Sequence, residues 1–142
     1  LHSLSHLLMH ALSLDCGYAA ASLSERLYCA AHDEETPMAA LMILTGTPGA
    51  EGTLGGLVEQ GRNLGRHLDH AFRIGSLCSN DPVCGHHLPD DHSERRLEGA
   101  ACHGCLYVAE CSCERFNRLL DRALVVPTLG CDPEAAFFQV KP

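Results

Sequence analysis

Apolar side chains recur at helical spacing at the start of the chain. They predict an amphipathic helix over about residues 1–14. The residues that set this spacing are Leu1, Leu4, Leu8, Ala11 and Leu12. Gly17 follows, and glycine in a left-handed conformation commonly caps a helix. Ser22 and Glu25 then have the spacing of a capping box, which predicts a short second helix that ends near Tyr28.

Between residues 38 and 72 the pattern changes from that of a strand to that of a helix. The apolar run MAALMILT (38–45) is short and ends in turn residues, which predicts a buried strand. The glycine-rich segment TGTPGAEGTLGG (45–56) lacks the Gly-Lys-Ser/Thr of a phosphate-binding loop, so we expect a strand-to-helix turn there. A broad apolar stripe predicts a helix from about Thr53 to Phe72.

Regular patterning is lost from Arg73 to Ala101, where the sequence is rich in turn residues. A compact domain rarely contains so long an irregular stretch unless something other than a hydrophobic core holds it in place. Further along, apolar positions at i, i+3, i+4, i+7 and i+8 predict a helix over about 113–124.

Composition limits the classes of function. The length of 142 residues suits one domain, 1–142, and because the chain begins within a helical pattern we expect a C-terminal fragment of a larger protein. A net charge of −8 disfavours broad electrostatic binding of nucleic acid, which then needs a local basic patch or a basic partner. No apolar run is long enough for a membrane span, and signal-peptide features are missing. We expect a cytoplasmic protein with nine reduced cysteines.

The spacing of the cysteines predicts a metal site. Tetrahedral zinc takes four ligands, and the turn from Cys102 to Cys105 supplies two of them from one tight loop. Cys113 fits a third position at the start of the expected last helix, where the helix dipole favours a negative sulfur. Cys78 or Cys84 supplies the fourth.

Such a site predicts the fold class. We expect an α+β, helix-rich single domain with a small sheet and a zinc-clamped irregular loop packed on the C-terminal helix. The zinc-binding subregion extends over 74–124, and the zinc is structural.

Three other uses of these thiols stay open. A redox pair formed by Cys102 and Cys105 normally occupies a strand-to-helix junction, and no such context precedes it. A nucleophile activated by the neighbouring His103 lacks an orienting third group. Disulfides require an oxidising compartment.

Histidines offer rival ligands. His2, His6 and His10 share one face of the first helix at a spacing that can hold a metal, but the pattern HExxH is missing. The simpler interpretation is a polar helix face packed on preceding sequence. Three histidines of the irregular loop can each replace a thiolate: His86, His87 and His92.

Basic residues line one face of the expected last helix. Arg115, Arg118 and Arg122 can contact phosphates, although such a stripe is also typical of a solvated face.

Taken together, the motifs resemble a known family. GAACHGCLYVAECSCERFNRLLDRALVVPT (99–128), CSNDPVC (78–84) and ILTGTPGAEGTLGGLVE (43–59) are similar to the zinc-binding domain of MrfA-type helicases. The chain resembles even more closely the DrmB family of the bacterial DISARM anti-phage systems. The resemblance covers about residues 1–128.

The resemblance also implies a ligand set. The helicases carry Cys-x-x-Cys and then Cys-x3-Asn, a register that Cys113 matches and Cys111 does not. With Cys84 favoured over Cys78, the expected zinc ligands are Cys84, Cys102, Cys105 and Cys113.

The function implied by the resemblance is helicase-associated DNA handling with a separate helicase/ATPase subunit as protein partner. The chain has no Walker lysine and no DEAD-like box, so we expect that it does not hydrolyse ATP unaided. We predict a non-catalytic zinc-binding accessory or scaffold domain in a bacterial anti-phage complex that contacts DNA through the complex. The rival hypothesis is a thiol-dependent redox or catalytic domain that uses the Cys102/Cys105 pair.

Overall fold

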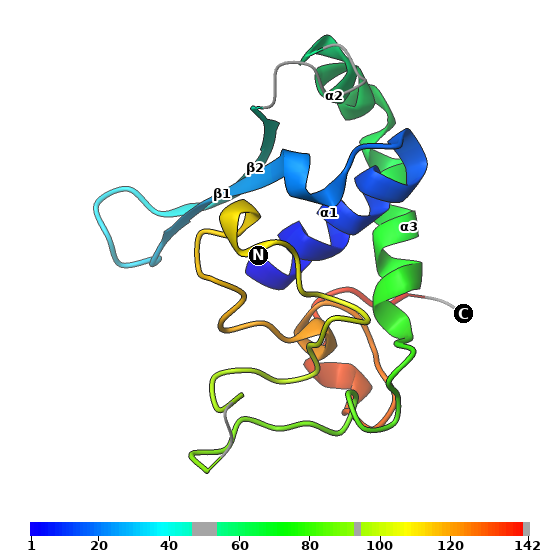
Figure 1. The fold of residues 1–142 in the computed structure, drawn as a ribbon. Helices are drawn as coiled ribbons and strands as arrows, with labels where there is room; N and C mark the ends of the chain where they lie inside the picture. The colour runs from blue at the N-terminus through cyan, green and yellow to red at the C-terminus, as the bar shows by residue number, and fades with distance from the viewer. Residues whose placement is uncertain (47–53, 93–94, 141–142) are drawn as a thin grey trace.

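The computed structural model describes residues 1–46, 54–92 and 95–140. It confirms the α+β class, with helices and a two-stranded antiparallel sheet in the first half and irregular chain in the second (Figure 1). The helices and strands are α1 (His2–Cys16), β1 (Leu23–Ala30), β2 (Met38–Thr45), α2 (Leu54–Gln60) and α3 (Leu64–Ser76). Within these ranges no helix has both the length and the apolar character needed to cross a lipid bilayer.

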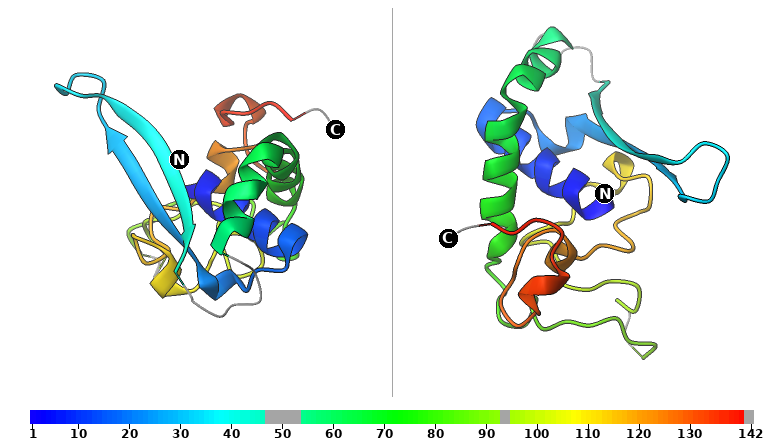
Figure 2. Two further views of the ribbon diagram at one scale, coloured as in Figure 1. Left: turned by 90° about the horizontal axis from the view of Figure 1, so that it is seen from above. Right: turned by 180° about the vertical axis from the view of Figure 1, so that it is seen from behind.

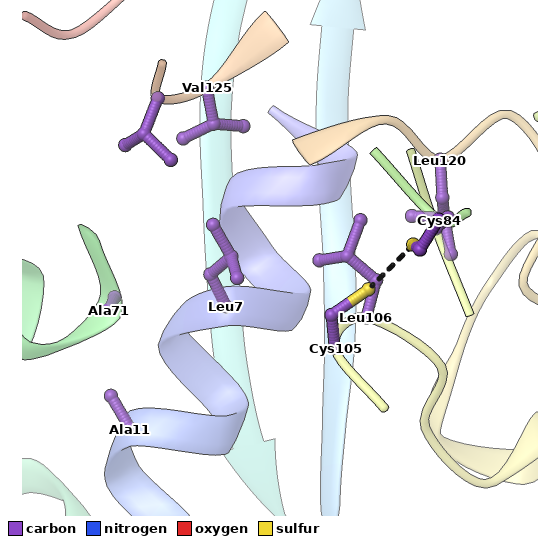
Figure 3. Packing of buried hydrophobic residues seen from close by; sticks show 10 residues of the cluster. Leu7, Ala11, Ala71, Cys84, Cys105, Leu106, Leu120 and Val125 are labelled. Carbon is purple, nitrogen blue, oxygen red and sulfur yellow. Dashed lines mark hydrogen bonds between the residues drawn. The ribbon is translucent and has the colours of Figure 1, made fainter. Parts of the chain in front are cut away.

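Helix α1 forms the centre of the fold, as its apolar pattern predicts. Leu7 and Ala11 are fully buried in a cluster that includes Ala71 of α3 (Figure 3). The helix ends at Gly17, whose φ of 71° is left-handed and whose N–H donates to the carbonyl of Ser13, so the predicted cap is confirmed. Helix α1 lies between α3 and the hairpin of β1 and β2 (Figure 1).

One prediction for the hairpin is wrong. The segment after Ser22 is strand β1 and not a helix, and it pairs with β2 from Leu23 opposite Thr45 to Ala30 opposite Met38. Leu23 and Glu25 both point inward, because their separation of two residues places them on one face of a strand. That tertiary contact overrides the capping-box spacing.

Strand β2 has the predicted bounds, but it is not buried. Leu41 and Ile43 pack against the cluster that contains Leu8 and Leu12 of α1, whereas Met38 and Met42 are largely exposed. In a two-stranded sheet only one face finds a partner. The turn end of the hairpin projects away from the helices (Figure 2).

The long helix expected over 53–72 is divided in two. A 3₁₀ turn, Gly61–Asn63, separates α2 from α3, and α3 continues to Ser76. Most of the glycine-rich turn expected over 45–56 lies outside the described residues.

The irregular segment predicted over 73–101 begins later than expected, because α3 continues to Ser76; residues 77–92 and 95–109 then form turns without a helix or strand. The helix expected over 113–124 is wrong. Phe116, Asn117 and Leu119 have positive φ angles, and only the 3₁₀ turn Arg122–Leu124 is helical there. Asn117 causes the difference, because its side-chain amide makes two hydrogen bonds with the backbone of Val108, at 3.1 and 2.8 Å.

Arg122 lies inside the protein and not on a basic face. Its side chain is fully buried, pairs with the carboxylate of Asp81 and donates to the carbonyl of Gly75 at 3.0 Å. The other oxygen of Asp81 accepts the N–H of Cys78 at 2.9 Å. This ion pair therefore joins the end of α3, the loop after it and the C-terminal part of the chain.

Removal of one partner of this buried pair should be costly. Asp81→Asn leaves the Arg122 guanidinium buried without its counter-charge, so we expect a loss of about 3–5 kcal/mol in the free energy of unfolding. Arg62→Gln removes an exposed pair with Glu59 and serves as the control, with an expected loss below about 1 kcal/mol. Urea denaturation measures both, and equal losses would contradict this account of Arg122.

Candidate metal centre

Four cysteines from two separate parts of the irregular chain meet at one point. Their Sγ atoms all lie within 4.8 Å of one another. Two come from the loop after α3 and two from the Cys-x-x-Cys turn: Cys78, Cys84, Cys102 and Cys105. Helix α3, the last α-helix in the described ranges, ends at Ser76, directly before this group.

The separations fit a tetrahedral ion. Zinc–sulfur bonds of about 2.3 Å place the sulfurs of a tetrahedral site about 3.8 Å apart. The Sγ–Sγ distances are 3.5 Å from Cys78 to Cys102, and 3.7 Å from Cys105 to both Cys84 and Cys102. They are far too long for disulfides, and all nine cysteines are free.

Hydrogen bonds prepare these sulfurs for negative charge. The Gly104 N–H donates to Cys102 Sγ at 3.3 Å, and Asn80 donates through its side chain to Cys102 and through its backbone to Cys78. Gly104 is closely packed in this turn, because a Cβ there would lie 2.7 Å from Ser79 Oγ and 3.3 Å from Cys78 Sγ.

Three of the four thiols differ in acidity: Cys84, Cys102 and Cys105. Burial raises the pKa of the Cys84 thiol to about 11, and it raises the pKa of Cys105 further. Burial acts in the same direction on Cys102, but hydrogen bonds from Asn80 and Gly104 outweigh it and lower the pKa of that thiol to about 7. Cys102 is therefore more thiolate-like than Cys84 and Cys105, which require the charge of a cation to lose their protons.

A permanent positive charge lies beside the site. Burial opposes the charged form of Arg122, but Asp81 and the sulfurs of Cys105 and Cys84 outweigh it and raise the pKa of the guanidinium. Zinc with four thiolates carries a net charge of −2. Arg122, which is paired with Asp81, lies on the side of the site where Cys84 and Cys105 are buried.

Three of the four ligands expected from the sequence are together here: Cys84, Cys102 and Cys105. The fourth member of the group is Cys78, which the sequence analysis ranked below Cys84. Cys113 instead groups with His2, His6 and Glu25, and Cys111 is exposed. Among the described residues, none of the loop histidines joins the four sulfurs. His86 instead forms a hydrogen bond with the carbonyl of Pro82.

The sulfurs are part of the hydrophobic core. Cys84 and Cys105 are 2% and 9% exposed and pack with Leu106 and Leu120, as Figure 3 shows around the Cys84–Cys105 contact. The site therefore anchors the irregular chain to the same cluster that holds α1 and α3.

Comparisons with known proteins agree with this geometry. A family model described as the MrfA Zn-binding domain matches residues 4–106, a range that contains all four grouped cysteines. The DISARM protein DrmB of Bacillus paralicheniformis is 43% identical over 131 residues, which cover 91% of this chain and 22% of that protein. The chain thus spans about a fifth of the length of this relative. Its four-cysteine group suits a structural zinc ion, and the chain belongs to the MrfA zinc-binding domain family.

Proposed function

We propose that this chain is a non-catalytic, zinc-stabilised accessory domain of a DISARM-type anti-phage defence protein. One observation carries the proposal: four sulfurs meet at tetrahedral spacing in a stretch of chain that has no helix or strand in its described part. The similarity to DrmB over 91% of the chain supports the defence role.

In this proposal the zinc ligands are Cys78, Cys84, Cys102 and Cys105. The set expected from the sequence has Cys113 in place of Cys78, and the Sγ distances favour Cys78. The zinc neutralises the buried thiolates and joins the loop after α3 to the Cys-x-x-Cys turn.

The partner in this proposal is a helicase/ATPase subunit, and DNA is contacted through the complex. The net charge of −8 supports an indirect DNA contact. Of the three arginines considered for phosphate binding, Arg122 is buried, which leaves Arg115 and Arg118 exposed. We place the protein in the cytoplasm, where reduced thiols are available to zinc. One domain over 1–142, with a zinc-binding subregion over 74–124, stays a prediction.

The low pKa of Cys102 favours the second candidate, a thiol-dependent redox or catalytic domain. The two candidates differ in whether Cys102 is available to react while the metal is bound.

Site-resolved alkylation separates them. Cys78 and Cys102 are half-buried, as are Cys16 and Cys131, so the second pair controls for accessibility. We expect iodoacetamide to label Cys16 and Cys131 in the native protein, and Cys78 and Cys102 only after a chelator removes zinc, as peptide mass spectrometry reports. Rapid, selective labelling of Cys102 before chelation would favour the thiol-dependent enzyme.

Serine variants test the ligand set. A structural zinc contributes on the order of 10 kcal/mol to folding, so Cys102→Ser and Cys78→Ser should each lose one zinc per chain and most of the soluble protein. Cys29→Ser, at an exposed position, is the matched control. Metal analysis of the full-length protein gives the zinc count. Full zinc content in Cys78→Ser would rule out the proposed ligand set.

The accessory role predicts a physical complex. The full-length protein should co-elute with the DISARM helicase subunit on size exclusion, and ATP hydrolysis should require that subunit. ATP hydrolysis by the protein alone would exclude a non-catalytic role.

A further inference from the structure

We propose that His2, His6, Glu25 and Cys113 bind a second zinc ion, distinct from the four-cysteine site. Their four ligand atoms lie within 4.8 Å of one another. They come from three elements that are far apart in the sequence: the start of α1, strand β1 and the turn that follows the 3₁₀ turn Glu110–Ser112.

The distances suit one ion shared by four ligands. In a tetrahedral zinc site, nitrogen lies about 3.3 Å from oxygen and about 3.6 Å from sulfur. Here His2 Nε2 is 3.1 Å from both Glu25 Oε1 and Cys113 Sγ, and His6 Nε2 is 3.3 Å from the same carboxylate oxygen. Both Nε2 atoms contact the same oxygen, Glu25 Oε1, and the two imidazole rings meet edge to face with centroids 4.6 Å apart.

His6 is oriented as a metal ligand. Its Nδ1 lies 2.8 Å from the carbonyl oxygen of Leu106, an acceptor that requires the N–H on Nδ1. The neutral ring therefore has its lone pair on Nε2, which faces the carboxylate of Glu25 at 3.3 Å. This lone pair and the carboxylate oxygen face each other, so a metal cation between them can be coordinated by both.

The sulfur of Cys113 is a hydrogen-bond acceptor. Its Sγ accepts the backbone N–H groups of Arg115 and Asn117, at 3.3 and 3.2 Å. Gly104 donates to Cys102 in the same way in the four-cysteine site. The positive φ of Asn117 and its side-chain clamp on Val108 hold this turn in place.

Glu25 completes the site with a carboxylate that contacts both histidines. Its side chain is fully buried, Oε1 also accepts the N–H of Glu114, and Oε2 has no hydrogen-bond partner among the described residues. One carboxylate and one thiolate balance Zn²⁺ with two neutral imidazoles, so the occupied site is electrically neutral.

Ligand chemistry and burial indicate the metal class and its role. Nitrogen, sulfur and carboxylate oxygen together are typical of zinc and unlike the all-oxygen sites of magnesium or calcium. Four protein ligands close a tetrahedral shell, and His6 and Cys113 are 0% and 6% exposed. The ion is structural, and it fastens the hairpin to the start of α1.

X-ray absorption at the zinc edge tests this site in the full-length protein, purified without added metal, together with the zinc count. We expect two zinc ions per chain, whose combined first shell holds five sulfurs and three nitrogen or oxygen atoms. One zinc with a sulfur-only shell overturns the second site and leaves the four-cysteine proposal intact. One zinc with a shell rich in nitrogen and oxygen does the reverse, and a protein without zinc overturns both.

Variants assign the second ion to its ligands. Cys113→Ser and Glu25→Gln should each lose one zinc, and the remaining shell should become sulfur-only. Cys111→Ser, two residues away and exposed, is the matched control and should keep two zinc ions. Two zinc ions in both ligand variants would overturn the assignment. The wild-type spectrum decides the question if a variant does not fold.

Discussion

The convergence of four sulfurs is the constraint on which the second half of the structure depends. Residues 77–92 and 95–109 have no helix or strand to satisfy the backbone or to bury a continuous apolar face. The contact of Cys78 and Cys84 with Cys102 and Cys105 fixes the positions of these two stretches relative to each other. A zinc ion at this point supplements the few buried side chains that the segment contributes to the core, which is why so long an irregular stretch is compatible with a compact fold.

The metal centre and the hydrophobic core are one structure. Cys84 and Cys105 belong to the same buried cluster as Leu7 of α1 and Leu120. The guanidinium of Arg122 lies beside the thiols of Cys84 and Cys105. Its partner Asp81 also accepts the backbone N–H of Cys78, so this ion pair is connected to a third cysteine. Loss of the metal would therefore leave excess negative charge or protonated thiols inside a packed cluster. The resulting loss in the free energy of unfolding includes weaker packing of the helices against that cluster.

Local patterns predicted what local interactions decide. The apolar spacing of α1, the cap at Gly17 and the bounds of β2 follow from neighbouring residues alone. The positions of Glu25 and Asn117 do not follow from local patterns. Glu25 is buried beside histidines that are distant in the sequence. Asn117 forms its hydrogen bonds with Val108 in a turn that has no apolar periodicity. The same limit explains Cys78 and Cys113: cysteine spacing identifies candidates, and only the path of the chain decides which sulfurs meet.

The two candidate metal sites share a short piece of backbone. Cys105 supplies its sulfur to the four-cysteine group, while the carbonyl of Leu106 accepts the Nδ1–H of His6. The Leu106 side chain is fully buried in the cluster that contains Cys105. A shift of this dipeptide away from the first site therefore moves the group that sets the ring orientation in the second. Helix α1 also connects the two sites, because it supplies Leu7 to that cluster and His6 to the second site. We therefore expect the hairpin, α1 and the irregular segment to fold as one cooperative unit.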